Sequence, residues 1–227
     1  MTKGLLIALE GVDGSGTTSQ RERVANALRE QGRTVHTTAE PSTGPIGKLL
    51  REILSGEMKT SPETVALLFA ADRLDHLKRE IVPALEQGQI VLTDRYIHSS
   101  VAYQSLAMDK DWVISLNREA KLPDLAILVK VSVEVAAQRR QERGGPEELF
   151  DAIEAQRKIA SAYDLAFEQE NLTLRSSLSK TARRLLHLHR FNGPARSARA
   201  RTTQRQPNAR CAAPINPPRA GVVAAAA

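Results

Sequence analysis

A glycine-rich loop near the start of the chain constrains the fold more than any other feature of this sequence. It follows the short apolar run 5–9 and precedes residues 18–31, where apolar side chains recur at helical spacing. Glycines let the backbone curl until successive N–H groups point inward, and the helix start adds partial positive charge. Such a unit is typical of a phosphate-binding loop, formed here by Gly11, Val12, Asp13, Gly14, Ser15, Gly16, Thr17 and Thr18.

Two adjacent residues of this loop support different interpretations of it. Thr18 supplies the hydroxyl that ligates Mg²⁺ in loops of this type. Thr17, however, stands where the pattern requires a lysine that neutralises the β- and γ-phosphates. Taken alone, the segment is either a phosphate-binding loop or a tight turn after a strand. The strand before it and the helix after it favour phosphate binding.

Strands alternate with helices along the rest of the chain. Apolar or β-branched runs predict buried strands, the last of them only a candidate, at 5–9, 34–38, 90–94, 125–131 and 172–174. A long helix opens at Pro62, and Pro83 is expected to kink or restart it. This alternation predicts a parallel sheet covered by helices on both faces. We therefore predict an α/β fold of the P-loop NTPase type, a three-layer sandwich with a parallel five-stranded sheet flanked by helices.

The charge of the chain is divided between two parts. Residues 1–170 carry all 26 acidic and 21 of the 32 basic residues, whereas residues 171–227 carry 11 basic residues and no acid. The net charge of +6 therefore does not indicate that the body of the protein binds nucleic acid. From about residue 192, Pro, Arg, Ala and Ser dominate. We predict one domain over 1–190, with a lid at about 139–150, and a basic, disordered tail over 191–227.

The cysteine content and the hydropathy of the chain favour a cytoplasmic location for the protein. The single cysteine, Cys211, excludes an internal disulfide framework and a cysteine-based zinc cluster. No apolar run approaches the roughly 20 residues that span a bilayer. The chain start does not resemble a signal peptide, since it enters a short strand without a long apolar stretch.

Two residue pairs lie where ligands of parallel sheets bind, at a strand end or on a helix. Asp94 can hold Mg²⁺ through water, and Arg95 can clamp phosphate, although such a pair is also a common surface ion pair. Phe69 and Arg73 lie four residues apart on one helix face, where a ring and a guanidinium suit a nucleobase. In isolation, a core phenylalanine with a surface arginine is the simpler interpretation of that second pair.

Two further groups of polar residues have equally open interpretations. The first group follows Asp94 by one or two helical turns and consists of Ser99, Ser100, Tyr103 and Gln104. These side chains can hydrogen-bond a base or a sugar, but such residues also occur at an ordinary polar helix start. The second group precedes a glycine pair and consists of Arg139, Arg140 and Arg143. It is typical of a lid that closes over phosphates, and equally of basic residues at the C-terminus of a helix.

Taken in order, these motifs resemble those of thymidylate kinases, which phosphorylate dTMP to dTDP. The matching segments extend over about residues 4–170 and are 8–16, 68–73, 94–96, 99–104, 122–124 and 142–145. The resemblance implies a transfer of phosphate from ATP to dTMP that uses Mg²⁺ and serves dTTP biosynthesis. It also implies a homodimer, which family members commonly form.

The resemblance implies roles on the acceptor side. Phe69 would stack on thymine, and Arg73 would hydrogen-bond its carbonyl edge. Ser100 and Gln104 would help to read the base. Arg95 would hold the acceptor phosphate, and Tyr103 would exclude a 2′-hydroxyl.

On the donor side, the loop 11–18 would bind ATP. Asp13 and Asp94 would help to position Mg²⁺ and the phosphates, and Thr18 and Asp94 would be the metal ligands. Arg143, assisted by Arg139, would be the cation of the lid. The catalytic residues implied are Asp13, Arg95 and Arg143.

Three departures from the family pattern remove positive charge near the phosphates. Thr17 replaces the loop lysine, Ala39 replaces an arginine before Glu40, and Leu149 stands where the lid often carries another arginine. Because this chemistry depends on positioning and charge stabilisation, either Arg143 and its neighbours compensate or the enzyme is weak.

Two other functions therefore remain as alternatives to an active kinase. One is a catalytically weakened nucleotide-binding protein of the same fold, which the missing lysine favours. The other is a protein that binds nucleic acid through its basic tail. The tail lacks a recognisable motif and has no stacking aromatic residue beyond Phe191, which favours a solvated, disordered appendage over a nucleic-acid-binding segment.

Overall fold

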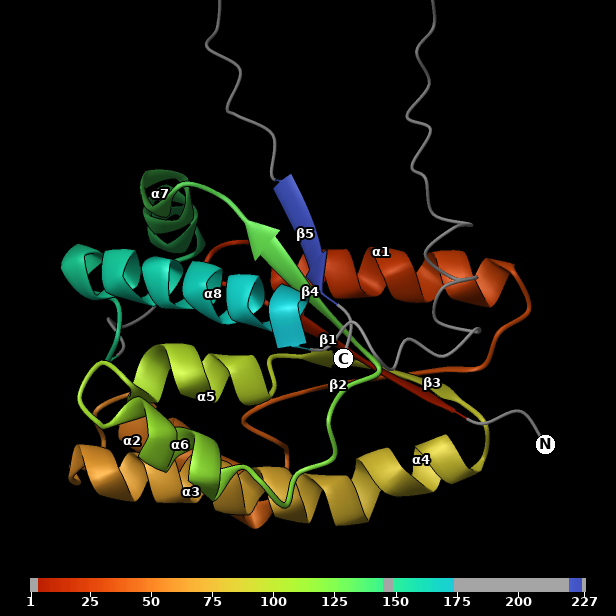
Figure 1. Cartoon of the computed structure of the whole chain (residues 1–227). Helices are drawn as coiled ribbons and strands as arrows, with labels where there is room; N and C mark the ends of the chain where they lie inside the picture. The colour runs from red at the N-terminus through yellow and green to blue at the C-terminus, as the bar shows by residue number, and fades with distance from the viewer. Residues whose placement is uncertain (1–3, 145–148, 174–220, 226–227) are drawn as a thin grey trace, which may run out of the picture.

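The computed structural model describes residues 4–144, 149–173 and 221–225 (Figure 1). Its parallel strands lie in the order β2 (Val35–Ala39), β3 (Ile90–Asp94), β1 (Leu5–Glu10) and β4 (Leu125–Lys130). Because β1 pairs with β3 on one side and β4 on the other, the loop that follows it emerges near the middle of the sheet. This arrangement confirms the predicted α/β fold with a parallel sheet flanked by helices.

The fifth strand differs from the prediction. β5 (Gly221–Ala225) pairs antiparallel with β4, so the sheet has four parallel strands rather than five. The candidate strand at 172–174 is wrong, because Leu172 and Thr173 end helix α8 (Ile153–Thr173) and residue 174 lies outside the described residues. β5 lies within the stretch 191–227, for which the sequence predicts disorder. A short strand can pair with the open edge of β4 through its backbone alone, which the average composition of the tail does not reveal.

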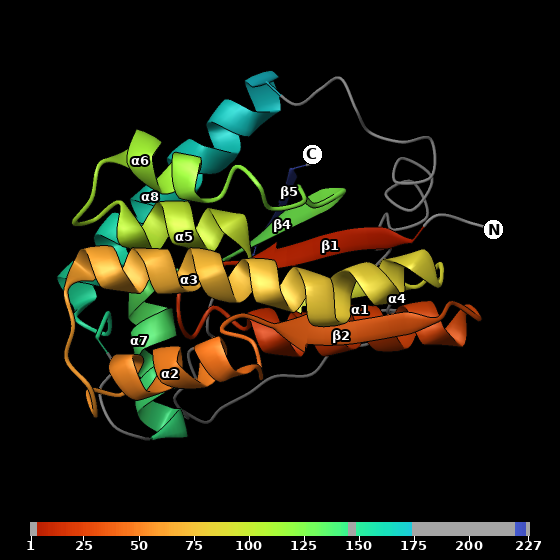
Figure 2. The ribbon, with the colours of Figure 1, turned by 90° about the horizontal axis from the view of Figure 1, so that it is seen from below.

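Helices cover both faces of the sheet (Figure 2). The remaining helical elements are α1 (Thr17–Glu30), α2 (Pro45–Leu54), α3 (Pro62–His76), the π-helical turn η1 (Leu77–Ile81), α4 (Val82–Glu86), α5 (Ile97–Gln104), α6 (Lys110–Leu116) and α7 (Val133–Arg143). Pro83 lies in the first turn of α4, directly after the π-helical turn, so the long helix restarts there as predicted. Ser61 caps the start of α3 by accepting a hydrogen bond from the backbone of Thr64.

The side chains of β1 alternate between the two helical layers. Leu6 and Ala8 pack with the layer that contains η1 and α4. Ile7 and Leu9 pack on the opposite face, against α1. All four side chains are buried. The strand is apolar from Leu5 to Leu9, as expected of a parallel sheet covered on both faces, and ends in the buried Glu10.

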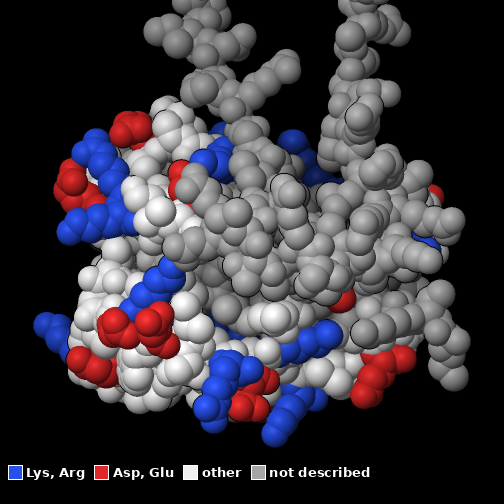
Figure 3. Space-filling model, in the orientation of Figure 1, with Lys and Arg blue, Asp and Glu red and all other residues white. Residues whose placement is uncertain are grey.

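The described surface carries charges of both signs. Lys and Arg side chains are interspersed with Asp and Glu side chains over the described part of the face in Figure 3. This agrees with the nearly balanced charge of residues 1–170. No helix within the described ranges is long and apolar enough to cross a membrane.

Candidate active site

The glycine-rich loop keeps an open conformation that depends on its glycines. Gly14 and Gly16 have φ values of 84° and 96°, in the left-handed region that glycine adopts without strain. A Cβ atom at Gly14 would also lie 2.3 Å from the carbonyl oxygen of Ala136 in α7. Glycine is therefore required where α7 crosses the loop.

The first turn of α1 and the end of β3 bring two oxygen ligands together. The hydroxyl of Thr18 donates a short hydrogen bond to Oδ2 of Asp94. Hydroxyl and carboxylate oxygens suit Mg²⁺, which usually takes few protein ligands and keeps water or phosphate oxygens in its other positions. The two residues therefore fit the metal role that the resemblance implies. A metal site made only of protein ligands is not present in the described residues, because they contain no cluster of three His, Cys, Asp or Glu that could hold a metal.

A cavity of about 470 Å³ adjoins this pair, and we call it the loop cavity. Its lining residues are Asp13, Gly14, Gly16, Thr17, Thr18, Ser19, Ala39, Glu40, Asp94, Arg95, Arg139 and Arg143. Thr17 and Ala39 bring no charge to it. The cations on its wall come instead from Arg95 and from the two arginines of α7. The structure thus brings the predicted lid arginines to the predicted phosphate loop.

Arg140 fixes α7 to the loop. Its Nη1 donates to the carbonyl oxygen of Asp13 at 2.7 Å, and its Nε lies 3.2 Å from Oδ1 of Asp151. On the same helix, Nη1 of Arg139 donates to the carbonyl oxygen of Ser15 at 3.2 Å. Arg140 has no predicted role of its own, because helical spacing does not indicate which arginine faces the loop.

The far end of the predicted lid is anchored to α2. The backbone N–H of Leu149 donates to the carbonyl oxygen of Leu54 at 3.2 Å. The next residue, Phe150, packs edge-on against Tyr103, with ring centroids 5.3 Å apart. Residues 145–148 lie outside the described part of the chain, so the predicted lid is described only at its two ends.

Arg95 lies between the loop cavity and a second cavity. Its φ is 71°, and it is the one non-glycine residue of the described chain with a positive φ. Such strain, of order 1–3 kcal/mol, is typical of functional positions. Its Nη2 donates to Oδ1 of Asp13 at 2.6 Å, and its Nη1 donates to the carbonyl oxygen of Gly11 at 2.9 Å. The alternative of an ordinary Asp94–Arg95 surface pair is therefore wrong, since each side chain bonds to the loop region instead.

Asp13 holds a negative charge beside this guanidinium. Burial favours the neutral acid, but Arg95, the Tyr103 hydroxyl at 3.1 Å and Arg140 outweigh it and hold the pKa of Asp13 below its ordinary value. Burial likewise opposes the charge of Arg95, but Asp13 raises the pKa of Arg95 well above its ordinary value. Burial also raises the pKa of Tyr103, so its hydroxyl stays a neutral donor to Asp13. The ion pair is therefore formed at neutral pH.

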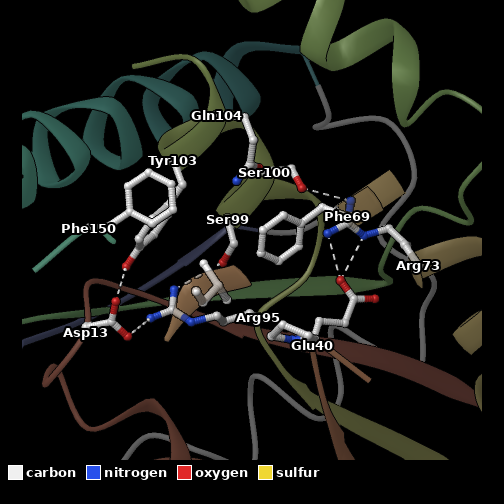
Figure 4. Close-up of a pocket in the computed structure, with 12 residues that line it drawn as sticks. Asp13, Glu40, Phe69, Arg73, Arg95, Ser99, Ser100, Tyr103, Gln104 and Phe150 are labelled. Atoms are coloured by element: carbon white, nitrogen blue, oxygen red, sulfur yellow. Dashed lines mark hydrogen bonds and ion pairs between the residues drawn. The ribbon is translucent and has the colours of Figure 1, made fainter. Parts of the chain in front are cut away.

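The second cavity, of about 190 Å³, carries three aromatic rings, and we call it the aromatic cavity (Figure 4). It is lined by Asp13, Glu40, Pro41, Leu54, Phe69, Arg73, Arg95, Ser99, Ser100, Tyr103, Gln104 and Phe150. All the residues that the resemblance places on the acceptor side are among them. They come from α3, from α5 and from the turn between β3 and α5, which the fold brings side by side.

Arg73 is a buried residue, with 1% of its surface exposed, so the alternative of a surface arginine is wrong. Nε and Nη2 both donate to Oε2 of Glu40, at 3.0 and 2.7 Å, and Nη2 also donates to the carbonyl oxygen of Tyr96 at 3.0 Å. Nη1 donates to Oγ of Ser100 at 3.0 Å and to Oδ1 of Asn117. All five guanidinium hydrogens therefore have acceptors within the protein.

Four residues that contact the site received no role from the sequence. Glu40 comes directly after β2, and Asp94 is the last residue of β3, so an acid at a strand end is a signal that could have identified Glu40. No local pattern marks the other three: Asn117, Phe150 and Tyr163. Their contacts arise only when segments distant in sequence pack together. Tyr163 of α8, for example, places its hydroxyl 3.3 Å from Nη1 of Arg95.

Comparisons with known proteins agree on one family. The family model described as thymidylate kinase matches residues 9–184. Proteins named probable thymidylate kinase from Pyrococcus horikoshii and Pyrococcus abyssi are each 42% identical to this chain, over 71% of it and 82% of their own length. A protein of the same name from Methanococcus vannielii is 42% identical over 69% of this chain and 75% of its own.

Proposed function

Since this chain belongs to the thymidylate kinase family, we propose that it transfers the γ-phosphoryl group of ATP to dTMP, as a step of dTTP biosynthesis. The observation that carries this proposal is the position of Arg95, which borders both the loop cavity and the aromatic cavity. A donor in one cavity and an acceptor in the other would present their phosphates to the same guanidinium. In-line transfer between them needs no covalent intermediate.

The loop cavity takes the donor. Backbone N–H groups of residues 11–18 bind the phosphates of ATP, and Arg139 and Arg143 supply the cations that Thr17 does not. Thr18 and Asp94 would hold Mg²⁺, and the ion would supply positive charge that stabilises the phosphates of ATP. Because α7 carries Arg143, the catalytic cation of the lid reaches the donor when α7 lies against the loop.

The aromatic cavity takes dTMP. Phe69 stacks on the thymine ring, and Ser100 and Gln104 lie where they meet the polar edge of the base. Arg73 can donate to a thymine carbonyl only by sharing a hydrogen of Nη1 that Ser100 or Asn117 accepts in this structure. The buried ring of Tyr103 crowds the sugar and excludes a 2′-hydroxyl.

At the junction of the two cavities, Arg95 clamps the acceptor phosphate. Asp13 orients Arg95 through their 2.6 Å ion pair, so the guanidinium is in place before the phosphate arrives. Because both partners are charged at neutral pH, no proton has to move before dTMP binds. The resemblance also supports a homodimer, and the cysteine usage supports a cytoplasmic location.

A coupled assay over the nucleoside monophosphates tests the proposal. ADP formation from ATP should depend on dTMP, and Arg95→Ala should reduce turnover by about 10²-fold or more while the protein stays folded. Arg23→Ala, which removes an exposed arginine of α1, is the matched control and should leave turnover unchanged. Turnover in Arg95→Ala close to that of the parent would refute the assignment.

The same assay separates the alternatives. The missing lysine at Thr17 favours a weakened nucleotide-binding protein, which would bind dTMP tightly without producing ADP. A nucleic-acid function of the tail would appear as salt-sensitive DNA binding that is lost when residues 192–227 are deleted. We expect dTMP-dependent turnover and no such DNA binding.

A further inference from the structure

Asn117 contacts a residue of the aromatic cavity without lining that cavity. It is the C-cap of α6 and is buried, with 6% of its surface exposed. Its Nδ2 donates to the carbonyl oxygen of Val113 at 2.9 Å. This contact sets the orientation of the carboxamide, because it leaves Oδ1 to accept a hydrogen bond from Nη1 of Arg73.

The two hydrogens of Nη1 of Arg73 are divided between Asn117 and Ser100. A guanidinium can only donate hydrogen bonds, so Oγ of Ser100 must be the acceptor in their 3.0 Å contact. The hydroxyl hydrogen of Ser100 is then directed elsewhere. No residue in the described part of the chain accepts it, and Ser100 lines the aromatic cavity (Figure 4).

We propose that Asn117 is a positioning residue for base selection: it holds Arg73 so that Ser100 presents a hydrogen-bond donor to the base. This inference rests on the proposed function and extends it to the chemistry of the selected edge. A fixed donor favours a carbonyl group, as at position 4 of thymine or uracil. It disfavours the amino group that cytosine carries at the same position.

The closed set of contacts around Arg73 gives Asn117 this influence. Glu40 and Tyr96 accept the three hydrogens on Nε and Nη2, so only the two on Nη1 can be redistributed. Without the carboxamide oxygen, one of them loses its acceptor in a buried environment. Arg73 then turns or draws in water, and the hydroxyl of Ser100 is free to reorient. A hydrogen bond to a charged group is strong enough for its loss to matter.

Three monophosphates and two variants test the inference. The ratio of kcat/KM for dUMP over dCMP isolates the base edge, whereas the ratio for dTMP over dUMP isolates the methyl group. Asn117→Leu should lower the first ratio about tenfold, raise the dissociation constant for dTMP by a similar factor, and leave the second ratio and the KM for ATP unchanged. Asn117→Asp keeps an oxygen for Arg73 but loses the donor to Val113, so the first ratio should stay within about threefold of the parent.

Two controls distinguish positioning from a structural role in capping α6. Asn26→Leu makes the same exchange at an exposed position of α1 and should change neither ratio. In an Arg73→Lys background, Asn117→Leu should add almost no further loss, because residues that act through one another are not additive. If Asn117→Leu does not fold, Asn117→Ala replaces it in the same comparison.

The inference is overturned if Asn117→Leu lowers thermal stability but leaves the dUMP-over-dCMP ratio intact. It is equally overturned if Asn117→Asp loses as much selectivity as Asn117→Leu. Absence of dTMP turnover in the parent protein would instead count against the proposed function. In that case, calorimetric binding of dUMP and dCMP still decides whether Asn117 sets the selectivity.

Discussion

Thr17 is buried in the first turn of α1 and brings no charge to the loop cavity. Gly14 and Gly16 nevertheless keep the loop open, and Arg139 and Arg143 border the same cavity. Positive charge on the wall of the loop cavity therefore comes from α7 and from Arg95 rather than from the loop itself. In the proposed binding mode, the loop supplies mainly backbone N–H groups, which do not depend on the residue type at position 17.

We expect that Thr17→Lys does not reduce the affinity for ATP. The new ammonium group would add positive charge where the phosphates bind, so the KM for ATP should be equal to or lower than that of the parent. Steady-state kinetics with varied ATP measure this, and Asn26→Lys on the exposed face of α1 controls for the added charge. A rise in KM beyond about tenfold would show that the loop binds ATP differently.

At the scale of elements, α7 links the glycine-rich loop to Asp151, which follows the predicted lid. Arg140 carries this connection, since it contacts the Asp13 carbonyl oxygen on one side and Asp151 on the other. Its side chain is 10% exposed, so water does not replace these contacts easily. The orientation of Arg139 and Arg143 over the loop cavity therefore depends on Arg140.

We predict that Arg140→Met, which keeps the aliphatic stem, raises the KM for ATP about tenfold and lowers the melting temperature. The physical reason is the loss of charge-assisted hydrogen bonds, worth about 1.5–3 kcal/mol each when well made. Thermal unfolding and ATP kinetics measure the two effects. Arg118→Met is the matched control, because the Arg118 side chain is 77% exposed and, within the described ranges, forms an ion pair only with the exposed Glu119. Equal effects in both variants would contradict the role assigned to Arg140.

The ion pair between Asp13 and Arg95 acts at the scale of the whole molecule, because it joins the loop after β1 to the turn after β3. The folded protein lowers the pKa of Asp13 below its ordinary value of 3.8. At mildly acidic pH, the folded state therefore binds fewer protons at this group than the unfolded state does. The stability it contributes is complete above the ordinary pKa and is lost as the pH falls through the lower, folded value.

Asp13→Asn should therefore be less stable than the parent at neutral pH. The difference in melting temperature should narrow as the pH falls below about 4. Thermal unfolding of both proteins across the acidic range tests this, with Asp111→Asn as the control at an exposed position of α6. A difference that stays constant across this range would show that Asp13 does not stabilise the folded protein through its charge.

Some of the site could be predicted because local chemistry and topology act together. Asp94 and the loop after β1 meet because β1 and β3 are adjacent parallel strands whose carboxyl ends lie at one edge of the sheet. Phe69 and Arg73 share a helix face, so their common cavity also follows from spacing. The burial of Arg73 could not be predicted in this way, because its acceptors Glu40 and Asn117 are 33 and 44 residues away.

By itself, the sequence determined the strand, loop and helix around Gly14, the burial of β1 in a sheet covered on both faces, and the residue types available for phosphate and base. These depend on backbone conformation and on periodicity, which act over a few residues. Only the tertiary structure decided that Arg140 rather than its neighbours holds the Asp13 carbonyl, that Asn117 supports Arg73, and that β5 runs antiparallel. Those contacts join segments far apart in the chain, and their partners are chosen by packing, which no local pattern records.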